Sequence, residues 1–280
     1  SGAGLSQSGV SMRVDELLKQ IRQWHPESAA VVDAFEPLVR VQTALQEEWA
    51  ARPIRALPPY TPDSLPVDPA EAVSVAERVA DALEQGFGGG DFAAAARALS
   101  RRPTPVRTLC RAVLAGDDAP LTHFAERHGL TNQDALRMVL LQTARALAAK
   151  ASLRVRRTNA SDKNSGQGGR CPCCHSPADM SMLVDKEGKR LLHCSLCGHV
   201  WRYARTACPY CGVDKADNIE MVYAEGRPEE RAERCRSCDA YLLAVDTRSR
   251  NIPAHLAYYV TLGMGHLDVL LQEDGAHPGV

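Results

Sequence analysis

Nine of the ten cysteines in this 280-residue chain lie between Cys171 and Cys238. Two cysteines separated by two residues in a tight turn point both sulfurs at one ion, so two such pairs complete a tetrahedral shell. The sequence therefore predicts two four-cysteine metal centres. Their ligands are eight cysteines in four Cys-x-x-Cys pairs: Cys171/Cys174, Cys194/Cys197, Cys208/Cys211 and Cys235/Cys238.

The spacing between the pairs favours a sequential grouping. Nineteen residues separate the first pair from the second, and 23 separate the third from the fourth. Both intervals are typical of zinc ribbons and rubredoxin-like sites. A cross-braced arrangement, in which the first pair joins the third and the second joins the fourth, also satisfies the spacing. All-thiolate sites suit zinc or rubredoxin-type iron, and the sequence does not separate the two metals.

The other thiols and the nearby histidines are assigned no ligand role. Cys173, next to Cys174, is interpreted as a bystander, and Cys110 lies in a helical apolar pattern typical of a core cysteine. Four cysteines already complete each shell, so the three histidines that flank the turns are expected on the surface or behind the ligands: His175, His193 and His199.

The first half of the chain has helical periodicity. Residues 12–152 are rich in alanine and leucine, which predicts an all-α domain after a disordered tail over residues 1–11. Pro37 is expected to kink or break its helix. The proline-rich segment 52–69 is expected to be an extended connector that is not packed. Residues 153–170 are basic and then Gly/Ser/Asn-rich, which predicts a linker.

The cysteine-rich half contains short strand-like pieces between turns. We predict one four-cysteine metal-ribbon module over residues 171–205, a second over 206–252, and a C-terminal helix and tail over 253–280. The expected fold class is α+β, with an N-terminal all-α helical domain followed by tandem rubredoxin-like or zinc-ribbon small β modules. Such modules draw folding free energy from their metal, on the order of 10–16 kcal/mol per structural zinc site.

Composition, charge and motifs argue against several functions. The formal net charge is −1, and residues 171–250 hold 12 Lys/Arg against 12 Asp/Glu, which argues against nucleic-acid binding. No apolar run reaches the length of a membrane-spanning helix, and no secretory signal is expected. No phosphate-binding loop, nucleophile elbow or His-Glu-x-x-His motif indicates an enzyme. Thiols at metal-ligand spacing suit a reducing compartment, so we expect a cytoplasmic protein.

The arrangement of motifs around the cysteines resembles the formate dehydrogenase accessory protein family, FdhE. A Leu-x-Cys-x-Leu-Cys segment over residues 192–197 is followed by Trp201, and Arg205 precedes the third pair. Tyr241 and Leu242 after the fourth pair match as well, as do the early His-Pro and the late segment GHLDVLLQEDG. The chain departs from the family at Leu243, where lysine is frequent, and in the proline-rich segment, which has no counterpart.

The resemblance implies a cytoplasmic accessory protein that is not an enzyme. Such proteins are required for the activity of respiratory formate dehydrogenases, contact the catalytic subunit before its export, and carry rubredoxin-type iron in the cysteine region. Two other hypotheses stay open: a metal-ribbon protein that binds nucleic acid or a transcription component, and a rubredoxin-like electron-transfer protein. The large helical domain argues against a simple electron carrier. The metal, the oligomeric state and the particular client enzyme are not indicated by the sequence.

Overall fold

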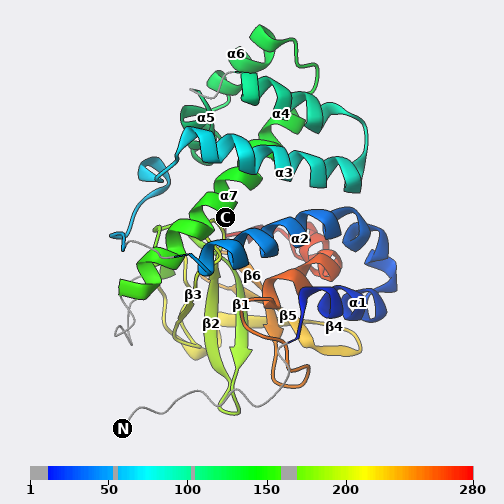
Figure 1. Cartoon of the computed structure of the whole chain (residues 1–280). Helices are drawn as coiled ribbons and strands as arrows, with labels where there is room; N and C mark the ends of the chain where they lie inside the picture. The colour runs from blue at the N-terminus through cyan, green and yellow to red at the C-terminus, as the bar shows by residue number, and fades with distance from the viewer. Residues whose placement is uncertain (1–11, 53–55, 102–104, 159–168, 280) are drawn as a thin grey trace.

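The computed structural model describes residues 12–52, 56–101, 105–158 and 169–279. The expected tail over residues 1–11 and most of the expected linker, residues 159–168, lie outside the described residues. Helices occupy the first half of the chain and a sheet the second (Figure 1), which confirms the expected α+β class. Within the described residues, no helix is long and apolar enough to cross a membrane.

Two helices form the N-terminal layer on the sheet. Helix α1 (Val14–Trp24) and helix α2 (Ala29–Ala50) are separated by the 3-10 turn η1 (Pro26–Ser28), where the His-Pro sequence interrupts the pattern. Helix α2 passes through Pro37 as one continuous element, so of the expected kink or break, the break does not occur. A proline costs a helix one hydrogen bond, and α2 is supported by packing against α1, two of the later helices and a C-terminal 3-10 helix.

Five further helices form the upper part of the molecule in Figure 1. Asp68 caps the first of them through a 2.9 Å hydrogen bond from the backbone N–H of Glu71, as its position before a proline predicts. The last helix runs down to the sheet and continues to residue 158, so it includes the first residues of the expected linker. The bounds are α3 (Pro69–Phe87), α4 (Asp91–Arg101), α5 (Val106–Ala115), α6 (Ala119–His128) and α7 (Gln133–Thr158).

The proline-rich connector is packed, contrary to our expectation. It contains one short 3-10 turn, η2 (Pro62–Ser64), and its apolar side chains Tyr60, Leu65 and Val67 are buried. The Tyr60 hydroxyl donates a 2.7 Å hydrogen bond to the carbonyl of Ala148 in α7. Prolines prevent a helix here, but they leave the side chains between them free to enter the core.

Strands from both cysteine segments, which we predicted as tandem small β modules, join in one sheet. Its order is β3-β2-β1-β6-β5-β4, and β1 pairs in parallel with β6 from Met180↔Leu243 to Leu183↔Asp246. The short strand β7 also pairs with β6. The bounds are β1 (Ala178–Val184), β2 (Lys189–Cys194), β3 (Val200–Arg202), β4 (Ile219–Ala224), β5 (Arg227–Cys235), β6 (Ala240–Asp246) and β7 (His277–Pro278), with the 3-10 turn η4 (Ala216–Asn218) before β4.

The helical half and the sheet share a core. Leu17 and Ile21 of α1 lie in the same buried cluster as Met180 of β1 and Val245 of β6. The expected closing helix is divided into a 3-10 helix, η5 (Ala257–Gly263), and an α-helix, α8 (Gly265–Glu273). The 3-10 helix packs against α1, α2 and β6, whereas α8 packs against the 3-10 helix and strands β4, β6 and β7, so the C-terminal region joins the N-terminal helices to the sheet.

Candidate metal centres

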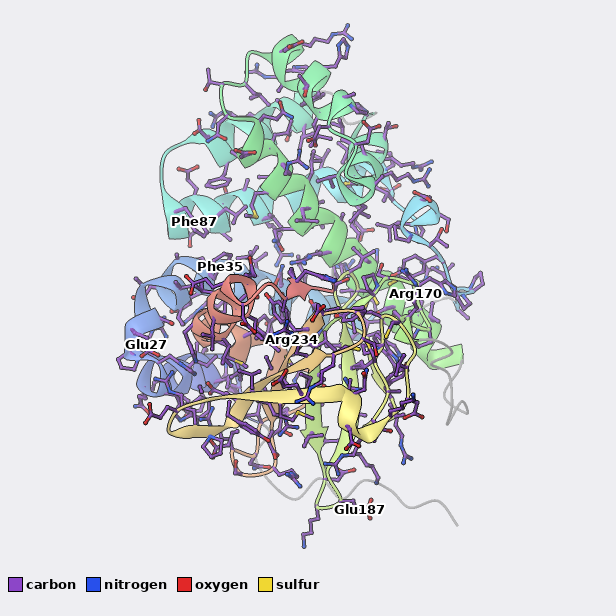
Figure 2. All side chains as sticks on the ribbon, turned by 180° about the vertical axis from the view of Figure 1, so that it is seen from behind. Glu27, Phe35, Phe87, Arg170, Glu187 and Arg234 are labelled. Atoms are coloured by element: carbon purple, nitrogen blue, oxygen red, sulfur yellow. The ribbon has the colours of Figure 1, made fainter. Side chains whose placement is uncertain are left out.

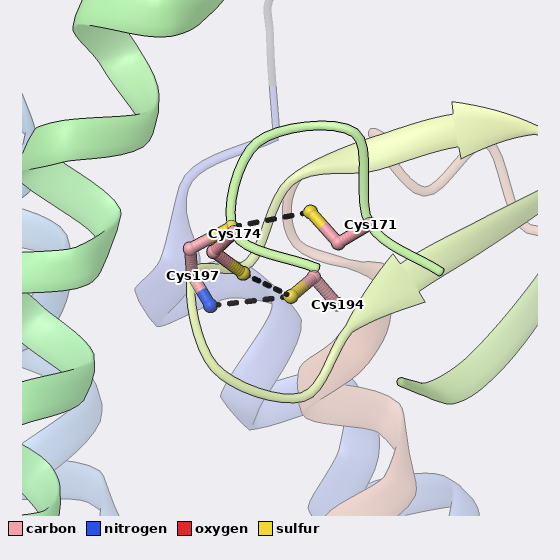
Figure 3. A group of neighbouring side chains, drawn as sticks. All are labelled: Cys171, Cys174, Cys194 and Cys197. Atoms are coloured by element: carbon pink, nitrogen blue, oxygen red, sulfur yellow. Dashed lines mark hydrogen bonds between the residues drawn. The ribbon is translucent and has the colours of Figure 1, made fainter. Parts of the chain in front are cut away.

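The eight paired cysteines form two clusters, each within one sequential set of four. Centre 1 holds Cys171, Cys174, Cys194 and Cys197, and centre 2 holds Cys208, Cys211, Cys235 and Cys238. In each cluster all four sulfurs lie within 4.8 Å of one another. The cross-braced alternative is not what the fold brings together. Figure 3 shows the four side chains of centre 1 converging from two turns.

The sulfur spacing fits a tetrahedral ion. The Cys171 and Cys197 sulfurs are 3.6 Å apart, and those of Cys174 and Cys194 are 3.4 Å apart. In centre 2 the sulfurs of Cys208 and Cys238 are 3.8 Å apart, and those of Cys211 and Cys235 are 3.6 Å apart. A tetrahedron with metal–sulfur bonds of about 2.3 Å has edges of about 3.8 Å, so each set of thiols is arranged as a zinc or iron shell requires.

All four cysteine turns have the same backbone geometry. The residue after each pair has a positive φ: 58° at His175, 65° at Gly198, 74° at Gly212 and 57° at Asp239. Its N–H donates to the carbonyl of the first cysteine of the turn, at 2.8 to 3.2 Å. Only two of these four residues are glycine, although glycine adopts this conformation at the lowest cost. The repeated turn is therefore clearer in the backbone than in the sequence.

Centre 1 is enclosed by the helical half of the protein. Its four cysteines are between 0% and 1% exposed. The backbone N–H of Tyr60 in the connector donates a 2.9 Å hydrogen bond to the carbonyl of Cys173, and the N-terminal half of the chain shares one buried cluster with these cysteines. The connector and α7 thus close this centre from solvent.

Centre 2 is partly open. Cys211 is exposed and Cys238 is half-buried, while Cys208 and Cys235 are buried. Asn218 donates from its amide to the Cys235 sulfur at 3.0 Å, and the His277 Nε2 lies 3.0 Å from the Cys238 carbonyl. These two contacts come from the 3-10 turn η4 and the C-terminal strand β7.

Without a cation, the clustered thiols do not ionise together. Burial raises the pKa of Cys208, and it raises the pKa of Cys238 to about 12. Burial and then the neighbouring thiols raise the pKa of Cys197 well above its ordinary value. A bound metal ion supplies the positive charge that holds such thiols as thiolates. The donor set therefore fits a metal ion in each cluster.

A buried ion pair joins the two cysteine segments. Arg190 in β2 donates to Glu233 in β5 at 2.6 Å, and both side chains are almost fully buried. The same guanidinium donates 2.8 Å hydrogen bonds to the carbonyls of Ala204 and Ala207, just before the third cysteine pair. This brace was not foreseen, because no local pattern in the sequence pairs residues 43 positions apart.

The histidines near the turns hold supporting positions. His193 Nδ1 lies 2.7 Å from Asp179, and its ring stacks on Tyr258 with centroids 4.5 Å apart. His199 stacks on Trp201, and His175 is exposed.

The two unassigned cysteines are both buried. Cys173 lies beside centre 1, where hydrogen bonds with Cys171 and Cys197 lower its pKa to about 2. It is outside the four-sulfur set. Burial in the helical core raises the pKa of Cys110 to about 12.

A third group of possible metal ligands comprises His25, Glu27 and His266. Here the Arg227 Nη1 lies 2.9 Å from His25 Nδ1 and donates to Glu27 at 2.7 Å. A guanidinium already occupies the place that a cation would take. We therefore read this group as an ion-paired contact between helix and sheet.

The fold and the two clusters define a protein with a helical half and a sheet that carries two four-cysteine clusters, each able to hold a metal ion, and the helical half encloses one of the clusters. The sequence model of the family described as "FdhE, central domain" matches residues 170–205, the segment that forms centre 1. The crystal structure of the FdhE protein from Pseudomonas aeruginosa has a similar fold, with a TM-score of 0.57 and 23% identity over 95% of this chain and 92% of that one.

Curated relatives match over shorter segments. A protein FdhE homolog from Aquifex aeolicus is 32% identical over 28% of this chain and 29% of its own length. One from Pseudomonas putida is 34% identical over 41% of this chain and 38% of its own length. The matched segments thus span only about a quarter to two fifths of these relatives. Together with the central-domain match and the shared fold, they show that the chain is similar to FdhE proteins in its cysteine segment and in its fold, as the cysteine motifs indicated.

Proposed function

We propose that this protein is a cytoplasmic accessory factor for the maturation of a formate dehydrogenase, that it binds the catalytic subunit of that enzyme, and that it carries out no catalysis of its own. The observation that supports this proposal is the coincidence of the FdhE central domain with centre 1. That domain is enclosed by helices that an isolated ribbon would not need. The helices that surround the cysteine turns of centre 1 provide a surface that a protein partner can bind.

We further propose that both clusters bind a metal ion, zinc or rubredoxin-type iron. Cys171, Cys174, Cys194 and Cys197 would hold one ion, and Cys208, Cys211, Cys235 and Cys238 the other. Either metal cross-links its two turns, and iron would in addition accept and donate one electron. Centre 1, which is enclosed, suits a structural role, whereas the exposed Cys211 lets a partner approach centre 2 closely.

The exposure of Cys211 is also the one observation that favours the electron-transfer alternative. An iron at centre 2 could exchange electrons with a docked protein, and centre 1 would not contribute. The nucleic-acid alternative gains no comparable support, because the cysteine segments have balanced charge.

Anaerobic co-purification tests the proposal. The full chain and a tagged formate dehydrogenase catalytic subunit are expressed together, and the bound fraction is measured with the metal content of each protein. We expect a complex with the wild-type chain, and its loss when Cys194→Ser and Cys197→Ser disrupt centre 1. No complex with the wild-type chain, under conditions where both proteins are folded and metal-loaded, would contradict the proposed function.

A further inference from the structure

A pocket of about 400 Å³ lies against centre 1. Helices α2 and α7 form two of its walls, the turn 194–198 forms a third, and η5 forms the fourth. We call it the centre-1 pocket. Its lining includes Leu38 and Gln42 of α2, Leu141 and Arg145 of α7, Leu196 of the turn, and Tyr258 of η5.

The pocket has the size and lining of a binding site. Ligand sites commonly measure about 300–1,000 Å³ and combine an apolar surface with a few polar groups. Here Leu38, Leu141 and Leu196 provide apolar surface. Any bound group would touch the turn that holds Cys194 and Cys197, two ligands of centre 1.

Arg145 gives the pocket a positive charge. It hydrogen-bonds Tyr258, but no ion pair joins it to a carboxylate within the described residues. Arg137, two turns earlier on α7, forms such a pair with Asp118. A cation in a partly apolar pocket is stabilised by an anionic partner. The amide of Gln46 lies on the facing helix, where it can bond to the backbone of an extended chain, whereas the Nε2 of Gln42 already donates to Gln142 at 2.9 Å.

An exposed apolar strip continues from the pocket along α2. Phe35 lines the pocket, and Val31, one turn earlier on the same face, is 45% exposed. Phe87, at the end of α3, is 47% exposed and packs edge-on against Phe35 with ring centroids 5.1 Å apart. Figure 2 shows Phe35 and Phe87 facing each other at the boundary between α2 and the upper helices. Apolar surface that extends a pocket in this way is typical of protein-binding sites.

We propose that the centre-1 pocket and this strip together bind an extended polypeptide segment of a partner protein, with apolar side chains and one acidic side chain that pairs with Arg145. A small molecule would fill the pocket and leave Val31 and Phe87 in water, whereas a polypeptide segment covers both. The inference rests on the proposed function, because it takes the client subunit as the source of the segment. A segment bound in the centre-1 pocket would then contact the turn that holds Cys194 and Cys197.

The first experiment measures charge recognition. Fluorescent overlapping peptides from a formate dehydrogenase catalytic subunit are titrated with the metal-loaded full chain and followed by anisotropy. Apolar peptides with an Asp or Glu should bind, and their Asn or Gln counterparts should bind about tenfold more weakly. Arg145→Gln should abolish this discrimination, and Arg145→Glu should reverse it in favour of Lys-containing peptides. Arg137→Gln, on the same helix but outside the pocket, should change nothing.

The second experiment tests the strip. Phe87→Ser should weaken binding of the same peptides, because it removes apolar surface beyond the pocket. Val269→Ser is the matched control, since Val269 is 57% exposed on α8 and lies outside the pocket and strip. Retained metal content and circular dichroism show that each variant is folded.

The outcomes separate this inference from the proposed function. Equal binding of the intact catalytic subunit by the wild type and both Arg145 variants would overturn the inference and leave the proposed function standing. Peptide binding that depends on Arg145, without any binding of the intact subunit, would support the pocket and contradict the proposed client. If 4-phenylbutyrate bound in an Arg145-dependent way but no peptide did, the polypeptide occupant would be wrong.

Discussion

The Nε2 atom of His25 lies 3.0 Å from Oε1 of Glu230, and both side chains are completely buried. The pair joins the turn between α1 and α2 to strand β5, across 205 residues of sequence. Arg250 also donates to Glu230, and its guanidinium stacks on Trp24 at 4.1 Å. The early His-Pro sequence therefore anchors the N-terminal helices to the sheet, which gives it a structural role.

This contact should make the unfolding free energy of the protein depend on pH. Burial alone would raise the pKa of Glu230, but hydrogen bonds from His25 and Arg250 outweigh it, and the net pKa is lowered from 4.5. The stabilisation is therefore complete above the unfolded-state pKa and is lost as the pH falls through the lower folded-state value. Glu230→Gln should cost about 3–5 kcal/mol of unfolding free energy at pH 7, because it removes the buried carboxylate that pairs with both His25 and Arg250 and leaves Arg250 only its 3.4 Å pair with Glu229.

Urea unfolding at pH 7 and at pH values descending below 4.5 measures this effect. The difference between wild type and Glu230→Gln should shrink as the pH falls. Glu225→Gln, on an exposed turn of the same sheet, serves as the control. A difference that is independent of pH would show that Glu230 acts through packing alone.

Gly263 packs against the buried ring of His25. A Cβ at this position would lie 2.3 Å from Cδ2 of His25, so any side chain must displace the buried ring. Gly263→Ala should destabilise the protein by about 1–3 kcal/mol, the usual cost of overpacking a core. Gly265→Ala, two residues on, meets nothing within 4 Å and should be neutral or slightly stabilising. Thermal unfolding of both variants checks the difference, and equal stability would contradict the tight packing.

The buried ion pair between Arg190 and Glu233 should contribute far more to the unfolding free energy than an ion pair on the surface. Glu233→Gln leaves a buried guanidinium without its charge partner and should cost about 3–5 kcal/mol. Glu220→Gln, which removes a pair of 3.7 Å between exposed side chains, should cost at most about 1 kcal/mol. Chemical denaturation followed by tryptophan fluorescence compares the two. Similar small losses would mean that the β1–β6 pairing alone holds the cysteine segments together.

The local features of this chain were predictable because they depend on short-range spacing. The Cys-x-x-Cys pairs fixed the candidate ligands, and the Asp68-Pro69 sequence fixed the start of α3. What sequence could not supply were the long-range relationships, such as the parallel pairing of β1 with β6 or the contact of His25 with Glu230. These depend on which buried surfaces meet. The connector was misjudged for the same reason, since proline content reports on backbone conformation and not on the burial of Tyr60 or Leu65.

The two centres should release metal at different rates. All four ligands of centre 1 lie beneath helices and the connector, whereas Cys211 of centre 2 is exposed to solvent. A chelator such as 4-(2-pyridylazo)resorcinol should therefore remove about one metal equivalent quickly, and the second only as the protein unfolds. The double change Cys208→Ser and Cys211→Ser should eliminate the fast phase of metal release.

The double change Cys194→Ser and Cys197→Ser should eliminate the slow phase and unfold the region around centre 1. Cys173→Ala should keep both phases, since Cys173 lies outside the four-sulfur set. Release of both equivalents at one rate from the folded wild-type protein would show that the covering helices do not control access to centre 1.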